Sequence, residues 1–497
     1  MRPISAASVL ILMFASAGCE SPRFDAGVPE PIRRYRTFNA RTQTVRGMPF
    51  LRVNGLLQAE LQAAVAGSDV SVARETLKDV IAACHQLARS TLQNEIDRLP
   101  PAGRDAMKRT HQPAGSDAPG HRSDPLSGYV ALQDELSAGR SVQDLRTIVD
   151  RIRKSIDPSP KDHQGHGLFL QWAIASHPES TDPMDKGGPR VDVYEPDSAS
   201  VTSFGGAGTA SWIERQLLAR YAPIIVQERV DGAPYSRRAD EIGAVRLSGT
   251  HDHIVVSVDT ASPSVYAYWQ HTLVRGRRHL QLVYTYWFPE RPRLKFGDAE
   301  VGHIDGATAR LTLDVDNQPA IFETIMNCGC YHRCFPVQSV ENTAAQGYGK
   351  PLDGKRFAIE RTMSGRLDWI VPETVADPPL ADSRPILFSR AGYHGLASVS
   401  FDPSTLSGRD VGRHRPYVLR PYDLLEQLPA PWGYGSMFGA DGLVHGAGRL
   451  EGWLLAPAGM LSAGQPRQRG THRIRWDQYD FDDPHLLERC LRLPTSF

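Results

Sequence analysis

The sequence predicts an α+β protein in which a short helical N-terminal region precedes a large, mainly antiparallel β-rich domain. Apolar residues recur at helical spacing through much of residues 51–158. Between residues 223 and 326, segments rich in β-branched and aromatic residues alternate with turn residues, as in hairpins. Beyond Pro351, shorter strand-like segments alternate with Pro and Gly loops. The pattern does not distinguish two stacked sheets from one sheet closed on itself.

The first eighteen residues have the layout of an export signal. Arg2 supplies a positive start, an apolar run extends from Ile4 to Phe14, and small residues lead into Cys19. This run is too short to span a bilayer. The stretch ASAGC resembles the lipobox of bacterial lipoproteins, although Ser16 stands where that family usually has Leu. The resemblance implies that residues 1–18 are a signal peptide and that Cys19 is acylated and becomes the mature N-terminus.

The same resemblance implies a cell-envelope address. An acylated Cys19 would tether the chain to a membrane, and Glu20, in place of Asp, favours the outer membrane among such lipoproteins, with the protein facing the periplasm. Residues 15–17 also read A-S-A, which fits an ordinary cleavage site and would release a soluble periplasmic or secreted protein.

Two regions precede the β-rich domain, which is predicted over residues 159–497. Residues 19–50 read as a basic tether, with six arginines that an anionic membrane surface would attract. Residues 51–158 carry two amphipathic helices, one of which ends before Pro100 and the other before Pro158. Cys84 lies on the apolar stripe of the first helix and is expected to be buried.

Composition limits the classes of partner. With 41% hydrophobic and 23% charged residues the chain has ordinary globular values. Its 56 basic and 56 acidic side chains give no net charge, and hence no electrostatic reason to propose a nucleic-acid partner. The membrane, reached through the lipid anchor, is the one partner that the sequence implies.

The densest group of candidate metal ligands is NCGCYHRC, residues 327–334. If the strand that begins near Ala320 continues through this segment, alternation places Cys328, Cys330, His332 and Cys334 on one face. Thiolates and imidazoles are the ligands that zinc and copper prefer. The sequence therefore predicts an envelope lipoprotein that binds zinc or copper here, either for catalysis or for structure.

A second pair of imidazoles would strengthen this site. His251 and His253, in THDHIVV, share one strand face by the same alternation. On their own they are more typical of the polar edge of a sheet. They become metal ligands only if the fold brings them to the cysteine segment.

Oxidation is the competing interpretation of the cysteines. An exported chain meets conditions in which disulfides persist. If Cys19 is acylated, five cysteines remain, and this odd number leaves at least one unpaired within the monomer. The alternative function is a metal-free, disulfide-stapled envelope binding or scaffold protein. A catalytic thiol is a further possibility.

A third hypothesis rests on carboxylates. Acidic and aromatic side chains are concentrated around Trp287, where Glu290, Asp298, Glu300 and Asp305 lie within a short stretch. Paired carboxylates beside aromatics suit a glycan or peptidoglycan hydrolase. Ser436, in GYGSMFG, lacks the first glycine of the G-x-S-x-G elbow, so the sequence does not predict a serine hydrolase. The C-terminal segments HGAGRLEGW and THRIRWDQYDFDDPH carry further His and Asp residues that would complete a site or line loops.

Overall fold

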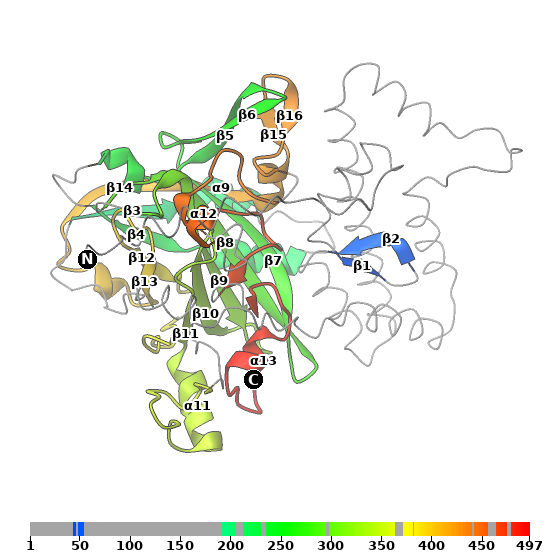
Figure 1. Ribbon diagram of the computed structural model, residues 1–497. Helices are drawn as coiled ribbons and strands as arrows, with labels where there is room; N and C mark the ends of the chain where they lie inside the picture. The colour runs from blue at the N-terminus through cyan, green and yellow to red at the C-terminus, as the bar shows by residue number, and fades with distance from the viewer. Residues whose placement is uncertain are drawn as a thin grey trace, which may run out of the picture.

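The computed structural model describes residues 43–45, 48–53, 190–204, 212–229, 235–294, 298–362, 371–380, 382–439, 442–455, 464–474 and 479–497. This part is mainly β, with 42% strand and 18% helix, and a ten-stranded sheet dominates it (Figure 1). The structure thus confirms the large β-rich domain. The predicted signal peptide, Cys19, Cys84 and the predicted helices of residues 51–158 lie outside the described residues.

The main sheet is mixed, with antiparallel pairing in the majority. Six of its nine neighbouring pairs are antiparallel, and β7–β14, β14–β3 and β4–β12 are parallel. In spatial order its strands are β11 (Arg333–Pro336), β10 (Pro319–Met326), β9 (Gly302–Leu313), β8 (Arg277–Arg291), β7 (Ser264–Val274), β14 (Val411–Pro421), β3 (Val191–Pro196), β4 (Ile224–Glu228), β12 (Ile386–Ser389) and β13 (Leu396–Ser400).

The longest strands form hairpins at turns that the sequence predicts. Arg275 and Gly276 join β7 to β8 with φ angles of 51° and 74°, as a tight two-residue hairpin turn requires. Asn317, with φ 59°, lies in the turn between β9 and β10. These local signals suffice because each strand pairs with its neighbour in sequence.

Side chains of β8 alternate between two apolar clusters. Tyr284, Tyr286 and Phe288 enter the inner cluster, which also contains Leu218 of helix α10. Trp287 points the other way, into a cluster beneath the β5–β6 ribbon and the C-terminal loops. Both faces of β8 are therefore buried, so it reads as a nearly continuous apolar run.

The sheet curls until its two edge strands approach each other. Arg333 of β11 donates from Nη1 to the carbonyls of Leu396 and Ala397 on β13, at 3.1 and 3.4 Å. The rings of Phe322 and Phe401 lie 5.4 Å apart in the inner cluster. This curvature brings the β12–β13 loop over the ends of β8 and β9, which are distant from it in strand order.

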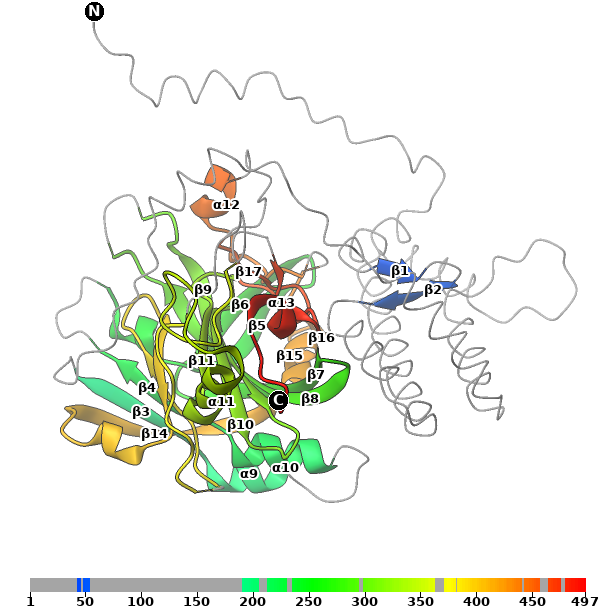
Figure 2. The ribbon, with the colours of Figure 1, turned by 90° about the horizontal axis from the view of Figure 1, so that it is seen from below.

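Helices and short two-stranded sheets make up the rest of the described secondary structure (Figures 1 and 2). The helices are α9 (Ser198–Phe204), α10 (Trp212–Arg220), α11 (Gln338–Tyr348), α12 (Leu450–Leu455) and α13 (Leu486–Cys490), with 3-10 turns η2 (Arg237–Asp240), η3 (Pro403–Leu406) and η4 (Tyr422–Glu426). The two-stranded sheets are β1 (Gln43–Val45) with β2 (Met48–Val53), β5 (Ala244–Thr250) with β6 (His253–Asp259), β15 (Leu428–Ala430) with β16 (Gly433–Gly435), and β17 (Arg473–Ile474) with β18 (Tyr479–Asp480). None of the described helices is long and apolar enough to cross a membrane.

Candidate functional site

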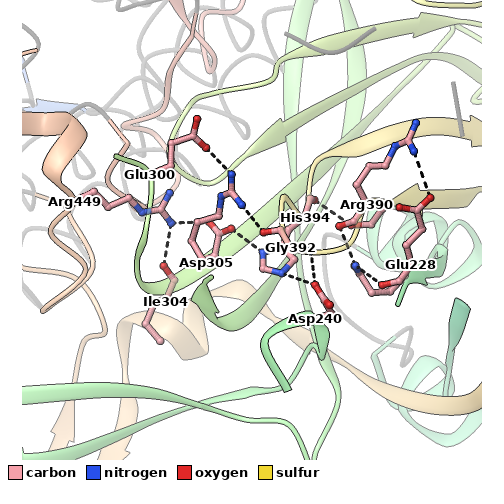
Figure 3. A network of polar contacts seen from close by, with 12 residues as sticks. Glu228, Asp240, Glu300, Ile304, Asp305, Arg390, Gly392, His394 and Arg449 are labelled. Carbon is pink, nitrogen blue, oxygen red and sulfur yellow. Dashed lines mark hydrogen bonds and ion pairs between the residues drawn. The ribbon is translucent and has the colours of Figure 1, made fainter. Parts of the chain in front are cut away.

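A network of buried charged side chains lies where β8 ends, β9 begins and the β12–β13 loop crosses them (Figure 3). Its centre is His394, which is fully buried. The Nδ1 atom of His394 is 2.8 Å from Oδ2 of Asp305, and its Nε2 atom is 3.2 Å from Oδ1 of Asp240. The ring stacks on Phe288 at 3.9 Å between centroids. His394 is thus clamped between two carboxylates and an aromatic face.

The pairing of β9 with β8 positions Asp305. It lies opposite Phe288 in the β8–β9 register, so its side chain enters the same inner face as the Phe288 ring. Its Oδ1 accepts a hydrogen bond of 2.7 Å from Arg449, which also donates to the carbonyl of Ile304 at 3.2 Å. Asp305 and Arg449 are both buried, so this pair interacts with little screening.

The charges in this network stabilise one another. Burial alone would raise the pKa of Asp305, but Arg449 and His394 lower it to about 2. Burial would lower the pKa of His394, yet its bonds to Asp240 and Asp305 raise it above the usual value. Asp305 is therefore ionised at neutral pH, and its contact with His394 shifts the imidazole toward its protonated form.

A second arm of the network is held by Arg291. Its guanidinium donates to the carbonyl of Gly392 at 2.6 Å and to Oε2 of Glu300 at 2.9 Å. The other oxygen of Glu300 accepts from the hydroxyl of Tyr331 at 2.9 Å. The amide of Gly392 in turn donates to Asp240 at 2.5 Å, which joins the two arms.

Among the described residues of this network, Glu451, near the start of α12, is a carboxyl group that forms no ion pair, although the charges of Arg449 and Arg291 act on it. Burial, followed by the charge of Glu300, raises the pKa of Glu451 to about 7. Its Oε2 atom has no hydrogen-bond partner among the described residues. The other carboxyl groups of the network each contact a basic side chain: Asp240 contacts His394, Asp305 contacts His394 and Arg449, and Glu300 contacts Arg291. Glu451 therefore retains its proton far more readily than an exposed glutamate.

Backbone strain is concentrated at the same place. Ile304, Tyr331 and His394 have φ angles of 58°, 56° and 55°. A positive φ is a true outlier for a β-branched residue such as Ile304. Such strain, worth about 1–3 kcal/mol per residue, tends to persist at functional sites, where surrounding contacts enforce it. The other described non-glycine residues with positive φ, Arg275 and Asn317, lie in hairpin turns.

The prediction that the strand continues through the cysteine segment, residues 327–334, is wrong. Strand β10 ends at Met326, and a turn follows in which the Met326 amide donates to the carbonyl of Cys330 at 3.0 Å. Gly329 makes this turn possible, with a φ of 95° that favours glycine. The neighbouring thiol of Cys328, together with burial, raises the pKa of Cys330 well above its usual value.

The turn divides the predicted ligands into two pairs. His332 lies with its Nε2 atom 3.1 Å from Oε1 of Glu323, and Glu323 is also bonded to Arg310. Cys334 is fully buried in an apolar cluster that also contains Cys490. Cys328 belongs instead to the inner cluster, against which Cys330 packs. Cys328 and Cys330 therefore have different surroundings from His332 and Cys334.

The two predicted histidine ligands lie on the β5–β6 ribbon. His251 packs its ring edge-on against Trp432 and has Nδ1 3.6 Å from Asp252, while His253 is exposed. Among the residues that the structure describes, no three or more His, Cys, Asp or Glu side chains form a group suited to a metal ion. The zinc or copper site stays a prediction.

Sequence reasoning found only part of the charged network. It singled out Glu300 and Asp305, but it gave no role to His394 or Glu451. Glu451 lies in the C-terminal segment HGAGRLEGW, for which the sequence suggested a role only for the histidine. His394 stands in a Gly-Tyr-His-Gly turn whose sequence carries no signal for burial between two carboxylates.

The arrangement supplies the parts of an acid–base pair. The pKa of about 7 makes Glu451 a proton donor near neutral pH, and Arg291 and the hydroxyl of Tyr331 fix the orientation of Glu300. No family model, curated protein or solved structure matches this chain. Its chemistry must therefore be argued from its own side chains.

Proposed function

We propose that this protein is an envelope-anchored hydrolase that cleaves glycosidic bonds, with Glu451 as the proton donor and Glu300 as the partner carboxylate. The observation that carries the proposal is the buried Glu451, whose pKa is raised to about 7 by burial and by the nearby Glu300. A carboxyl group that keeps its proton near neutral pH, close to a second carboxyl group, is a usual basis for assigning a general acid and its partner.

The surrounding residues support these two roles. Arg291 and the hydroxyl of Tyr331 each engage one oxygen of Glu300, which fixes the orientation of this carboxyl group. Glu451 would donate its proton to the oxygen of the leaving group, and Glu300 would activate water or attack the sugar carbon. Asp305 takes neither role in this proposal, because Arg449 and His394 engage its two oxygens.

A glycan is the substrate class that the neighbouring residues favour. Tyr393 is 41% exposed, and the guanidinium of Arg291 lies 4.3 Å from the centroid of its ring. A partly exposed aromatic side chain next to Arg291, which also holds Glu300, offers a surface against which a sugar ring could pack. Peptidoglycan is the glycan that an envelope protein facing the periplasm would meet.

The proposed location rests on Cys19. Acylation there would hold the domain at the membrane, with the outer membrane favoured. Replacing Cys19 by Ala should move the protein from the membrane pellet to the soluble periplasmic fraction. Unchanged association with the pellet would contradict the anchor.

Glycan hydrolysis is tested with the purified mature chain on peptidoglycan and on other envelope polysaccharides, by the release of reducing ends. Glu451→Gln and Glu300→Gln should each lower the rate by about 10²-fold or more, the usual range for loss of an acid or base. Glu290→Gln is the matched control, because Glu290 is a half-buried carboxylate on β8 outside the network. Absence of hydrolysis by the wild type, or full activity of Glu451→Gln, would overturn the proposal.

Zinc or copper binding is retained as a second candidate, because the thiols of Cys328 and Cys330 are neighbours and soft metals prefer paired thiolates. The predicted site also needs His332, so His332→Ala should lower the metal content of the native protein as much as Cys330→Ser does. A metal-free native preparation would favour the alternative of a disulfide-stapled binding or scaffold protein.

A further inference from the structure

Six arginines gather at one end of four neighbouring strands of the main sheet. Arg190 precedes β3 and Arg409 precedes β14, Arg413 and Arg415 lie in the first half of β14, Arg229 follows β4, and Arg390 follows β12. Because β14 and β3 are parallel, and β4 and β12 run the other way, these positions meet at the same end of the sheet. We call the six residues the arginine cluster.

The arginine cluster carries more positive charge than its carboxylates neutralise. Its ion pairs join Arg190 to Asp410, Arg229 and Arg413 to Asp192, Arg413 and Arg415 to Glu241, and Arg390 to Glu228. The charge of Arg409 also acts on Glu228. Even with these four carboxylates ionised, two of the six positive charges stay unmatched.

Three of the carboxylates lie beneath the guanidinium groups. Asp192, Glu228 and Glu241 are 1%, 5% and 8% exposed, whereas the side chains of Arg413 and Arg390 are 40% and 33% exposed. Arg413 uses its Nε and Nη2 atoms for Asp192 and Glu241, which leaves further donors of the guanidinium for a ligand. The buried carboxylates therefore orient the arginines and leave a cationic surface toward solvent.

Two of the guanidinium groups approach the same backbone position. A Cβ at Gly412 would lie 3.0 Å from Nη1 of Arg229 and 3.2 Å from Nε of Arg190, and Arg413 is the next residue in the chain. Like charges this close repel one another, and an anion that binds between them relieves the repulsion. Guanidinium groups pair with carboxylate, phosphate and sulfate in a bidentate manner, so this arrangement suits an anionic ligand.

The arginine cluster adjoins the charged network. Arg390 is the first residue of the loop that carries His394, and its Nη1 atom is 3.5 Å from Oε1 of Glu228. Figure 3 shows Glu228 and Arg390 on the far side of Asp240 from Glu300. A polymeric ligand bound at Glu300 can therefore extend onto the arginine cluster.

We propose that the arginine cluster binds the anionic groups of an acidic polysaccharide. This inference rests on the proposed function, because it names the substrate class of the same site. A glycan chain with carboxylate or sulfate groups would place a sugar unit at Glu300 and Glu451 while its neighbouring units pair with arginines. Peptidoglycan fits this class, because its peptides carry free carboxylates.

The test measures binding by isothermal titration calorimetry. The ligands are hexagalacturonate, its methyl ester, in which the same sugars carry no charge, and a heparin hexasaccharide, which adds sulfate. The mature Glu451→Gln protein is used, because loss of the proton donor keeps the ligands intact. At least one acidic ligand should bind about tenfold or more tightly than the methyl ester, and its affinity should fall between about 0.05 M and about 0.5 M salt because ions screen the charges.

Substitutions in the same protein assign the binding to the arginine cluster. Arg413→Gln and Arg190→Gln should each weaken binding of the acidic ligand by about tenfold. Arg413→Gln leaves Asp192 paired with Arg229 and Glu241 paired with Arg415, so no buried carboxylate loses its last partner. Arg190→Gln alters only an exposed ion pair, and an unchanged unfolding midpoint would show that both variants are folded.

Arg277→Gln is the matched control, because Arg277 is an exposed arginine at the opposite end of β8 from the network, and it should bind like the parent protein. No binding of either acidic ligand, equal affinity for the methyl ester, or full affinity in both cluster variants would overturn the inference. Binding that depends on the cluster, without hydrolysis by the wild type, would support the site and defeat only the hydrolase. Hydrolysis of the methyl ester as fast as the acidic form would defeat only the site.

Discussion

Replacing His394 by Ala should lower the free energy of unfolding, because His394 lies at the centre of the charged network. The substitution removes two charge-assisted contacts, to Asp305 at 2.8 Å and to Asp240 at 3.2 Å. Each is worth about 1.5–3 kcal/mol, and loss of one partner from a buried ion pair costs about 3–5 kcal/mol in other proteins. The stacking on Phe288 adds about 1 kcal/mol. Because these contributions overlap, we expect a loss of about 4 kcal/mol in the free energy of unfolding.

Urea unfolding of the mature protein, followed by tryptophan fluorescence, measures this loss, since Trp287 is fully buried near the site. His414→Ala is the control, because His414 is an exposed residue on β14 and should change stability by no more than about 0.5 kcal/mol. The contribution of His394 to the free energy of unfolding should also depend on pH in a predictable direction. The raised pKa of His394 makes its contribution full below about pH 6.5, its ordinary value, and the contribution is lost as pH rises through the folded-state value. A loss below about 1.5 kcal/mol at pH 6, or one that grows with pH, would refute the reasoning.

Two further predictions concern Glu451 and Gly306. The pKa of Glu451 is raised from 4.5 to about 7, so its contribution to stability is greatest below pH 4.5 and is lost as pH rises through about 7. Unfolding free energies measured across this range should therefore vary less with pH in Glu451→Gln than in the wild type, and identical slopes would contradict the shift. A Cβ on Gly306 would lie 2.2 Å from Nδ2 of Asn327 and 2.8 Å from the carbonyl of Tyr286, so Gly306→Ala should cost about 3 kcal/mol in urea unfolding. Gly347→Ala in α11, where a Cβ meets nothing within 4 Å, should be neutral or slightly stabilising, and equal costs for both substitutions would argue against the close packing at Gly306.

The parts of the fold that the sequence predicted depend on neighbours in the chain. The Arg275–Gly276 and Asn317 turns and the strands they join each carry their own local pattern. The prediction of a strand through residues 327–334 was wrong. Alternation of residue types cannot reveal a turn that depends on a glycine and on hydrogen bonds to backbone groups distant in sequence.

The site could be predicted only in fragments for a related reason. Asp240, Asp305, His394 and Arg449 come from four separate segments that meet because the sheet curls and its edge strands approach. In sequence each resembles a solvated loop residue, since charged residues mostly populate the surface. Only Glu300 and Asp305, which follow an aromatic strand closely, formed a recognisable local cluster.

The central claim is that Glu451 carries a proton near neutral pH, because burial and the nearby Glu300 raise its pKa to about 7. Infrared difference spectroscopy measures this most directly, because a protonated carboxyl group has a carbonyl stretching band that its carboxylate lacks. Between pH 5 and pH 9 the wild type should lose one such band with a midpoint at about pH 7, and Glu451→Gln should lack this change while Glu290→Gln retains it. A midpoint near the ordinary glutamate value of about 4.3, or a band near pH 7 that persists in Glu451→Gln, would contradict the account.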